Sequence, residues 1–279
     1  MGILFGLAAA LAWGTSDFLG GRFATKYPAL TVGFISQATS FALLLLLALF
    51  VRPEISAGAL AWGVAAGVFT SLGGVALYQG LATGDSAVVA PLSACGAVVP
   101  VAFAVATGDV PSALQSLGIV LAFLGILLVS LPRAGMQFTS SGHLRPVFWG
   151  LAAAIGFGLF FVLVDAGTSS DSESLVVLTA ARCAGVVLVG TIALWLRQLI
   201  WPGRDVVWMA GSGAIEMSAI GSFALASTRG NIAVASVLAS LYPIQTLVLS
   251  RYFTDERFTR LRLAGAALAL AGVACISVG

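Results

Sequence analysis

The chain has 279 residues, of which 59% are hydrophobic and only 9% charged, with a mean hydropathy of +1.06 and a net charge of +2. Soluble domains carry about 25% charged residues, so this composition excludes an ordinary soluble fold. The sequence also has no cluster of basic residues of the kind that binds nucleic acid.

Apolar runs follow one another along the whole chain, separated by glycine, proline and charged residues. Each run approaches the roughly 20 residues that a helix needs to cross a bilayer core of about 30 Å. The runs do not alternate between polar and apolar residues as barrel strands do. We therefore expect ten membrane-spanning helices, near residues 3–21, 30–51, 59–80, 86–107, 114–131, 147–167, 175–196, 206–226, 231–250 and 262–278.

Short patterns in the first half recur in the second half in the same order. The run from Gly6 to Ala10 returns at Gly150 with an offset of 144. Later matches keep the order while the offset drifts to 146 and 147: Gly84, Ala87, Val88 and Leu92 with Gly230, Ala233, Val234 and Leu238, then Gly118, Ala122 and Gly125 with Gly265, Ala269 and Gly272. This pattern predicts a duplication, with a first five-helix repeat at 1–132, a connecting loop at 133–146 and a second repeat at 147–279.

An odd number of spans in each repeat brings the second repeat into the membrane from the opposite side. The predicted fold is therefore an all-α membrane protein with ten transmembrane helices in two inverted five-helix repeats. This plan is common in secondary transporters, whose substrate site lies near the membrane midplane between the repeats.

Basic residues in the connections predict the orientation, because they are enriched on the cytoplasmic side. The connections after even-numbered spans hold only Arg52 and Arg229. Those after odd-numbered spans hold ten: Arg22, Lys26, Arg133, Arg145, Arg197, Arg204, Arg251, Arg257, Arg260 and Arg262. We expect both termini on the non-cytoplasmic face of a plasma membrane, the inner membrane in a bacterium.

Four motifs resemble those of a known family. They are Trp13-Gly14-Thr15-Ser16-Asp17-Phe18, Gly84 through Ser93, Ala239-Ser240-Leu241-Tyr242-Pro243 and Asp255-Glu256-Arg257. Over essentially its whole length the chain resembles EamA-type transporters of the drug/metabolite transporter superfamily. The resemblance implies a ten-helix carrier, in many members an exporter of amino acids and other metabolites, with a cavity lined by both repeats. Members often have cytoplasmic termini, whereas the loop charges here predict the opposite.

Three ionisable side chains stand well inside predicted spans, where each costs about 2.5–3.5 kcal/mol on insertion scales. Asp17 follows Trp13 by one helical turn, so the pair could hold a cationic or zwitterionic group. The related small multidrug resistance proteins use an acidic residue in their first span for proton and cation exchange, which implies the same role for Asp17. The alternative is a backbone cap or an ion pair with Arg22.

Glu216 lies near the centre of the eighth span, where a carboxyl group could line a cavity and exchange protons, or form an internal ion pair with Arg182. Arg182 could instead bind a substrate carboxylate through its guanidinium fork. The candidate substrate-binding residues are Trp13, Ser16, Asp17, Gln37, Tyr78, Gln79, Arg182, Glu216, Tyr242 and Gln245, and the candidates for proton coupling are Asp17 and Glu216.

We expect a secondary transporter for a small metabolite such as an amino acid or organic cation, coupled to protons or passive, acting as an exporter. A channel and an intramembrane enzyme acting on lipid are the alternatives. The chain has no Walker or HExxH motif, and its one histidine, His143, lies in a polar loop. We therefore expect no catalytic residue, cofactor or bound metal. The expected partners are the substrate and the bilayer, in a monomer or in a homodimer formed through the glycine and alanine stripes.

Overall fold

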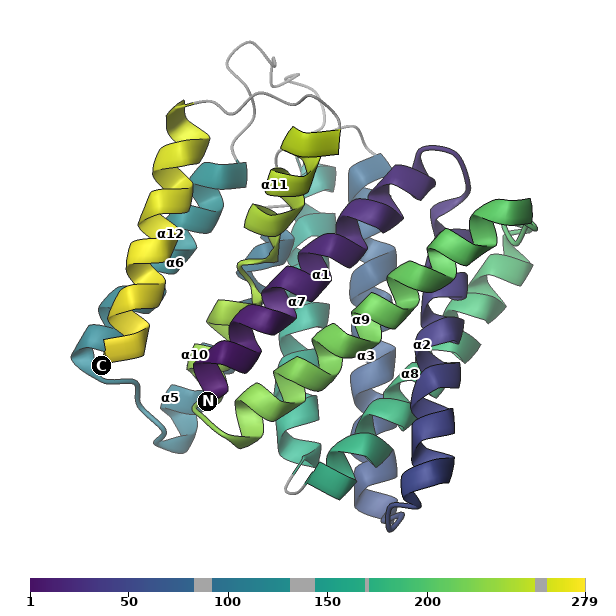
Figure 1. Cartoon of the computed structure of the whole chain (residues 1–279), viewed down its shortest axis with the longest axis horizontal. Helices are drawn as coiled ribbons and strands as arrows, with labels where there is room; N and C mark the ends of the chain where they lie inside the picture. The colour runs from purple at the N-terminus through teal and green to yellow at the C-terminus, as the bar shows by residue number, and fades with distance from the viewer. Residues whose placement is uncertain (83–91, 131–143, 169–170, 254–259, 279) are drawn as a thin grey trace.

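The structure, a computed structural model, describes residues 1–82, 92–130, 144–168, 171–253 and 260–278. Within these ranges the chain forms helices and no β-strand (Figure 1). The helices are α1 (Gly2–Ala24), α2 (Ala29–Val51), α3 (Ala57–Ala82), η1 (Cys95–Ala97), α5 (Val98–Thr107), α6 (Ala113–Ser130), α7 (Leu144–Gly167), α8 (Asp171–Trp195), η2 (Gly203–Asp205), α9 (Val206–Thr228), α10 (Ile232–Ala239), α11 (Tyr242–Phe253) and α12 (Arg260–Val278). The first part of the motif from Gly84, most of the predicted connecting loop and Asp255-Glu256-Arg257 lie outside the described residues.

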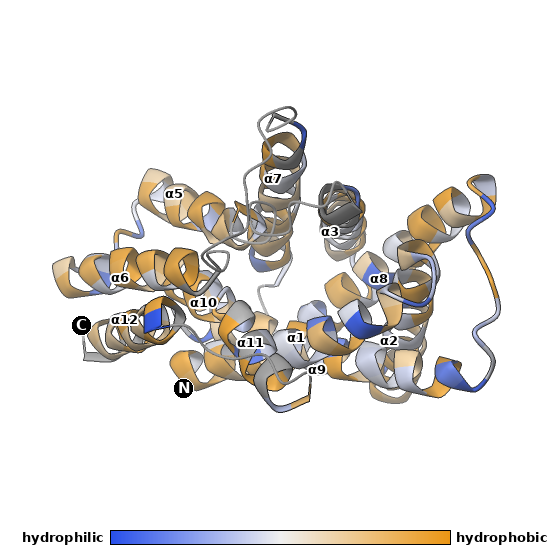
Figure 2. Cartoon of the chain, turned by 90° about the horizontal axis from the view of Figure 1, so that it is seen from above, coloured by the Kyte–Doolittle hydropathy of each residue, from blue (hydrophilic) through white to orange (hydrophobic). Residues whose placement is uncertain are grey.

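Five helices in the described part of the chain are long and apolar enough to cross a membrane: those at Gly2–Ala24, Ala29–Val51, Ala57–Leu77, Val147–Gly167 and Glu173–Trp195. Large apolar side chains on their outer faces are exposed, among them Leu4 at 66%, Leu46 at 63% and Val187 at 62%. Figure 2 shows the apolar colouring spread over the outside of the bundle. An apolar exterior of this kind suits contact with lipid.

In two of the predicted spans, 86–107 and 231–250, the described residues do not form one regular α-helix. Helix α10 ends at Ala239, four residues before Pro243, and the 3-10 turn η1 includes Gly96, four residues before Pro100. Proline lacks an N–H and its ring clashes with the carbonyl four residues earlier, which breaks a regular helix. After the break, the chain continues as α11 and α5.

The main helix pairs join one half of the chain to the other. Helix α1 packs along α9, α3 along α7 and α8, α2 along α8 and α9, and α6 along α12. By their order in the two halves, α1 corresponds to α7, α2 to α8 and α3 to α9. The contact between α1 and α9 is therefore equivalent to the contact between α7 and α3, and the contact between α2 and α8 is equivalent to itself. The same contact also recurs at residue level: a Cβ on Gly67 would overlap the carbonyl of Ala181, and a Cβ on Gly213 would overlap that of Ser36.

Helices α6 and α12 lie side by side at one edge of the bundle in both views (Figures 1 and 2). A Cβ added to Gly118 would lie 2.6 Å from the carbonyl oxygen of Gly272, and one added to Gly272 would lie 2.6 Å from that of Gly118. Ala122 and Ala269 between them are fully buried. The two small-residue stripes therefore pack against each other inside one chain, as close contact of membrane helices requires.

Polar contacts join the connection between α1 and α2 to that between α8 and α9, at the upper right of Figure 1. Lys26 Nζ lies 2.6 Å from Asp205 Oδ2, and the Tyr27 hydroxyl donates to the same oxygen at 2.8 Å. These hydrogen bonds lower the pKa of Asp205 below its ordinary value of 3.8, and the bond to Asp205 raises the pKa of Lys26 above 10.5. The pair thus links the two halves at the end of the bundle away from both termini.

We predict that Gly118→Ala lowers the melting temperature of the detergent-purified protein, because its methyl group separates α6 from α12. Gly74→Ala is the matched control, since its methyl group would enter open space within a helix. Alanine favours a helix over glycine by about 1 kcal/mol, so the control should be neutral or stabilising. Equal melting temperatures for the two variants would contradict the close packing of α6 against α12.

We predict that Asp205→Asn lowers the melting temperature slightly at neutral pH. Because the folded pKa of Asp205 is depressed, its contribution to the stability of the fold is fully present above about pH 3.8 and is lost as the pH falls through the folded pKa. The contribution of Lys26 to the stability of the fold is present below pH 10.5 and is lost as the pH rises through its raised folded pKa. A melting-temperature difference between wild type and variant that persists unchanged at acid pH would refute this assignment.

Candidate functional site

A charged pair lies between α8 and α9 in the interior of the bundle. Arg182 Nη2 is 2.9 Å from Glu216 Oε1, and Arg182 is only 3% exposed. The Ser36 hydroxyl on α2 donates to Glu216 Oε2 at 2.8 Å, so both carboxylate oxygens have partners. Gly213, one turn before Glu216, lets α9 approach the Ser36 backbone closely enough for this bond.

Behind the ion pair, three buried oxygen atoms have no hydrogen-bond partner among the described residues: Gln37 Oε1, Ser40 Oγ and Ser71 Oγ. Gln37 Oε1 rests against Gly185, one turn after Arg182, and Ser71 Oγ lies 2.9 Å from where a Cβ of Gly185 would be. A larger residue at Gly185 would displace both side chains. The interface of α2, α3, α8 and α9 is therefore polar at its centre.

Helix α1 is held between α9 and α11 by hydrogen bonds at the three residues that precede Asp17. The Ser16 hydroxyl donates to the carbonyl of Ser212 at 3.1 Å, and Thr246 on α11 donates to the carbonyl of Gly14 at 3.0 Å. Gln245 donates to the Thr15 hydroxyl at 3.4 Å. These bonds fix the rotation of α1 and thereby the direction of the Asp17 side chain.

Asp17 itself is exposed, although α1 packs against four other helices, α2, α9, α10 and α11. Its carboxylate lies within electrostatic range of Glu216 and of the Tyr242 hydroxyl, which hydrogen-bonds to Ser93. No ion pair joins Asp17 to Arg22 in the part of the chain that the structure describes. The open surface at Asp17 therefore lies next to the charged pair.

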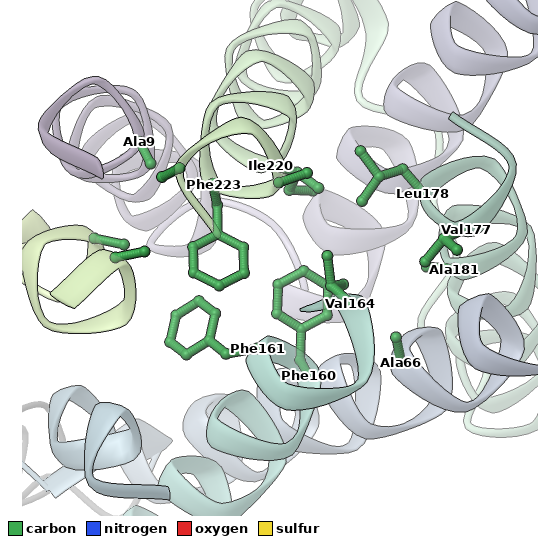
Figure 3. Packing of buried hydrophobic residues seen from close by; sticks show 14 of the residues in the cluster. Ala9, Ala66, Phe160, Phe161, Val164, Val177, Leu178, Ala181, Ile220 and Phe223 are labelled. Atoms are coloured by element: carbon green, nitrogen blue, oxygen red, sulfur yellow. The ribbon is translucent and has the colours of Figure 1, made fainter. Parts of the chain in front are cut away.

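An aromatic cluster lies one turn from Asp17 toward the N-terminus of α1. The Trp13 ring is 5.8 Å from Phe161 and 6.1 Å from Phe223, and these two phenyl rings are 4.6 Å apart. Figure 3 shows Phe160, Phe161 and Phe223 facing one another from α7 and α9. Phe223 is fully buried. We call Asp17, Arg182, Glu216 and this cluster the seam, because they lie where the two halves meet.

The structure brings together most of the residues that sequence analysis selected. Trp13, Ser16, Asp17, Gln37, Arg182, Glu216, Tyr242 and Gln245 lie on the helices that meet at the seam. Gln79 is instead exposed near the end of α3, and the side chain of Tyr78 lies outside the described residues. Sequence analysis missed Ser36, Phe161 and Phe223, although Phe223 follows Glu216 by two helical turns on the same face.

The fold and the seam define a class: a multi-pass integral membrane protein with charged groups held between two similar halves. The model of the EamA-like transporter family matches residues 1–131 and 144–278, one match in each half. The chain therefore belongs to this family of membrane transporters, in the drug/metabolite transporter superfamily.

A solved crystal structure described without a functional name superposes on this chain with a TM-score of 0.83. The two sequences are 16% identical, and the match covers 99% of this chain and 96% of the other. At this identity the likeness shows the fold alone. No curated protein matches the sequence.

We predict that Arg182→Met destabilises the protein by about 3–5 kcal/mol, because it leaves the Glu216 carboxylate inside the bundle without its cation. Combining Arg182→Met with Glu216→Gln should recover most of this loss, since an uncharged pair has no unmatched charge. Denaturant unfolding of the detergent-purified protein measures both effects. A single variant as stable as wild type would contradict a structural role for the pair.

Proposed function

We propose that the chain is a secondary carrier that works by alternating access and exports a small metabolite such as an amino acid or organic cation. The observation that carries this proposal is the seam, which combines α1 of the first half with α7, α8 and α9 of the second, while Ser36 on α2 donates a hydrogen bond to its Glu216. A binding site shared by two halves can open to either side when one half moves against the other. The proposed substrate-binding residues are those that lie on the helices meeting at the seam: Trp13, Ser16, Asp17, Gln37, Arg182, Glu216, Tyr242 and Gln245.

We infer that the halves are inverted repeats of five spans each, in a ten-span protein. Several contacts support this arrangement. Gly2 lies against the backbone of Gly230 while Ser16 bonds to Ser212, so α1 runs antiparallel to α9. Exchanging the halves preserves the helix pairs, as a two-fold relation requires. The breaks before Pro100 and Pro243 offer hinges in the fourth span of each repeat, which are the fourth and ninth spans of the chain.

We propose that the protein resides in the plasma membrane, the inner membrane in a bacterium, with both termini on the non-cytoplasmic face. Figure 1 draws the two chain ends on the same side of the bundle, and the connection with Lys26 lies on the other side. That other side also carries Arg204, which is exposed within η2. The positive-inside rule supports this orientation.

We propose that Asp17 and Glu216 couple transport to protons. The two carboxylates lie within electrostatic range of each other, so a proton on one favours the charged form of the other. A substrate cation and a proton could therefore compete for the same negative charge, which is the basis of an exchange mechanism.

We predict saturable counterflow by the protein in liposomes. Its solutes would first be selected by a thermal-shift screen of amino acids, organic cations and nucleosides. A pH gradient should accelerate the flux, and the acceleration should be lost in Asp17→Asn and in Glu216→Gln. Glu54→Gln, which neutralises an exposed carboxylate outside the helices, is the control.

Flux that ignores the gradient in wild type and survives both seam variants would exclude proton coupling and leave a passive carrier. Failure of every stabilising solute to show counterflow would exclude the carrier itself.

A further inference from the structure

We propose that the connection between α8 and α9, residues 196–205, binds the phosphate of an anionic phospholipid headgroup through Arg197 and Arg204. Trp195 and Trp201 then lie at the boundary between the headgroups and the acyl chains. This connection is beside the one between α1 and α2, at the upper right of Figure 1, and contains none of the seam residues. The inference concerns a lipid partner, so it goes beyond the proposed carrier function.

Arg197 ends helix α8 in an unusual backbone conformation. Its φ of 54° lies in the left-handed region, which is unfavourable for a residue with a side chain. The Arg197 N–H donates to the carbonyl of Leu194 at 3.0 Å, and the Gln198 N–H donates to that of Ala193 at 2.8 Å. These bonds close the last turn in the way that usually calls for a glycine. An arginine here places its cation beside the free carbonyl groups of the helix end, which favour a positive charge.

Helix α2 holds the backbone of this connection in place. The Thr31 hydroxyl donates to the carbonyl of Gln198 and accepts a hydrogen bond from the Ile200 N–H at 3.3 Å. Thr31 is fully buried, and Pro202 is also buried. The backbone that carries the two arginines is therefore ordered before a ligand binds, which lowers the entropic cost of binding.

The connection carries two cations that lack a partner within the described part of the chain. Arg197 and Arg204 are both exposed, and no hydrogen bond or ion pair joins either side chain to another described residue. The one acidic residue of the connection, Asp205, already binds Lys26 and Tyr27. A guanidinium group binds phosphate oxygens through two parallel N–H donors. The connection therefore offers two positive charges that suit an anionic phosphate.

Exposed tryptophans place these cations at the depth of the lipid headgroups. Trp195 is 82% exposed and Trp201 is 80% exposed, and Leu199 and Ile200 between them are exposed as well. Tryptophan is enriched at the membrane–water interface, where the indole ring contacts acyl chains and its N–H contacts headgroups. Two such rings in water would be unfavourable. The surroundings of the arginines therefore fit a phosphate that belongs to a lipid.

Arg52 provides a comparison within the same chain. It corresponds to Arg197 at an offset of 145 and ends α2, also with a φ of 54°. Phe50 beside it is 87% exposed. The following connection, residues 52–56, contains the exposed Glu54 but no second cation and no tryptophan. The same backbone geometry thus occurs there without a net positive charge, and we expect no preference for anionic lipid at that end of α2.

The test measures lipid binding to the detergent-purified protein by native mass spectrometry. It compares dioleoylphosphatidylglycerol, which is anionic, with dioleoylphosphatidylcholine, which is zwitterionic and has the same acyl chains. We expect wild type to bind phosphatidylglycerol at least about fivefold more tightly, since each arginine near a membrane surface adds to the attraction for anionic lipid. The preference should shrink as the ionic strength rises.

The double variant Arg197→Gln with Arg204→Gln should lose the preference for phosphatidylglycerol. Arg52→Gln is the matched control, because it removes the same charge from the same backbone geometry at the end of α2, and it should keep the preference. Trp201→Ser should weaken the binding of both lipids to a similar extent.

Equal binding of the two lipids by wild type would overturn the inference, as would a preference that survives in the double variant or is lost in Arg52→Gln. Displacement of bound phosphatidylglycerol by an excess of glycerol 3-phosphate would assign the site to a soluble phosphate and reject the lipid. Arg204→Gln alone lies outside the left-handed position, so it should reduce the preference even if the double variant folds poorly. The measurement involves no transport, so its outcome does not depend on the carrier function.

Discussion

The packing of helices at the centre of this protein depends on the ion pair between Arg182 and Glu216. Two charges are stable inside an apolar bundle only when each has a partner and the remaining donors and acceptors are hydrogen-bonded. Meeting that requirement brings α8 against α9 and draws α2 in through Ser36, with Gly213 allowing the close approach. The helices that line the proposed site are thus those that the pair holds together.

The duplication provides the same helix contacts twice, but the charges occupy only one copy of each position. Asp17 in the first half aligns with Phe161 in the second at an offset of 144, and Gln37 aligns with Arg182 at an offset of 145. A negative group and an aromatic group therefore face the seam from equivalent places. Symmetric packing is compatible with the two-state motion of the proposed carrier, whereas the charged groups between the halves are not symmetric.

Much of the fold follows from hydrophobic run length, because lipid requires every backbone polar group to be satisfied within a helix. The glycine and alanine stripes on α6 and α12 were also readable from their spacing, but a stripe does not identify its partner. In the structure Gly118 lies against Gly272, so the two stripes pack against each other within one chain. Hydropathy does not register a missing N–H, so run length places the spans at 86–107 and 231–250 without their interruptions, which the structure locates before Pro100 and Pro243.

The sequence by itself determined that the chain lies in a membrane, that its halves are related and that Asp17, Arg182 and Glu216 are its costly charges. These conclusions depend on composition and order along the chain. The tertiary structure decided which charges neutralise each other, because pairing depends on distances between helices far apart in sequence. It paired Arg182 with Glu216 and left Asp17 exposed, without an ion-pair partner among the described residues.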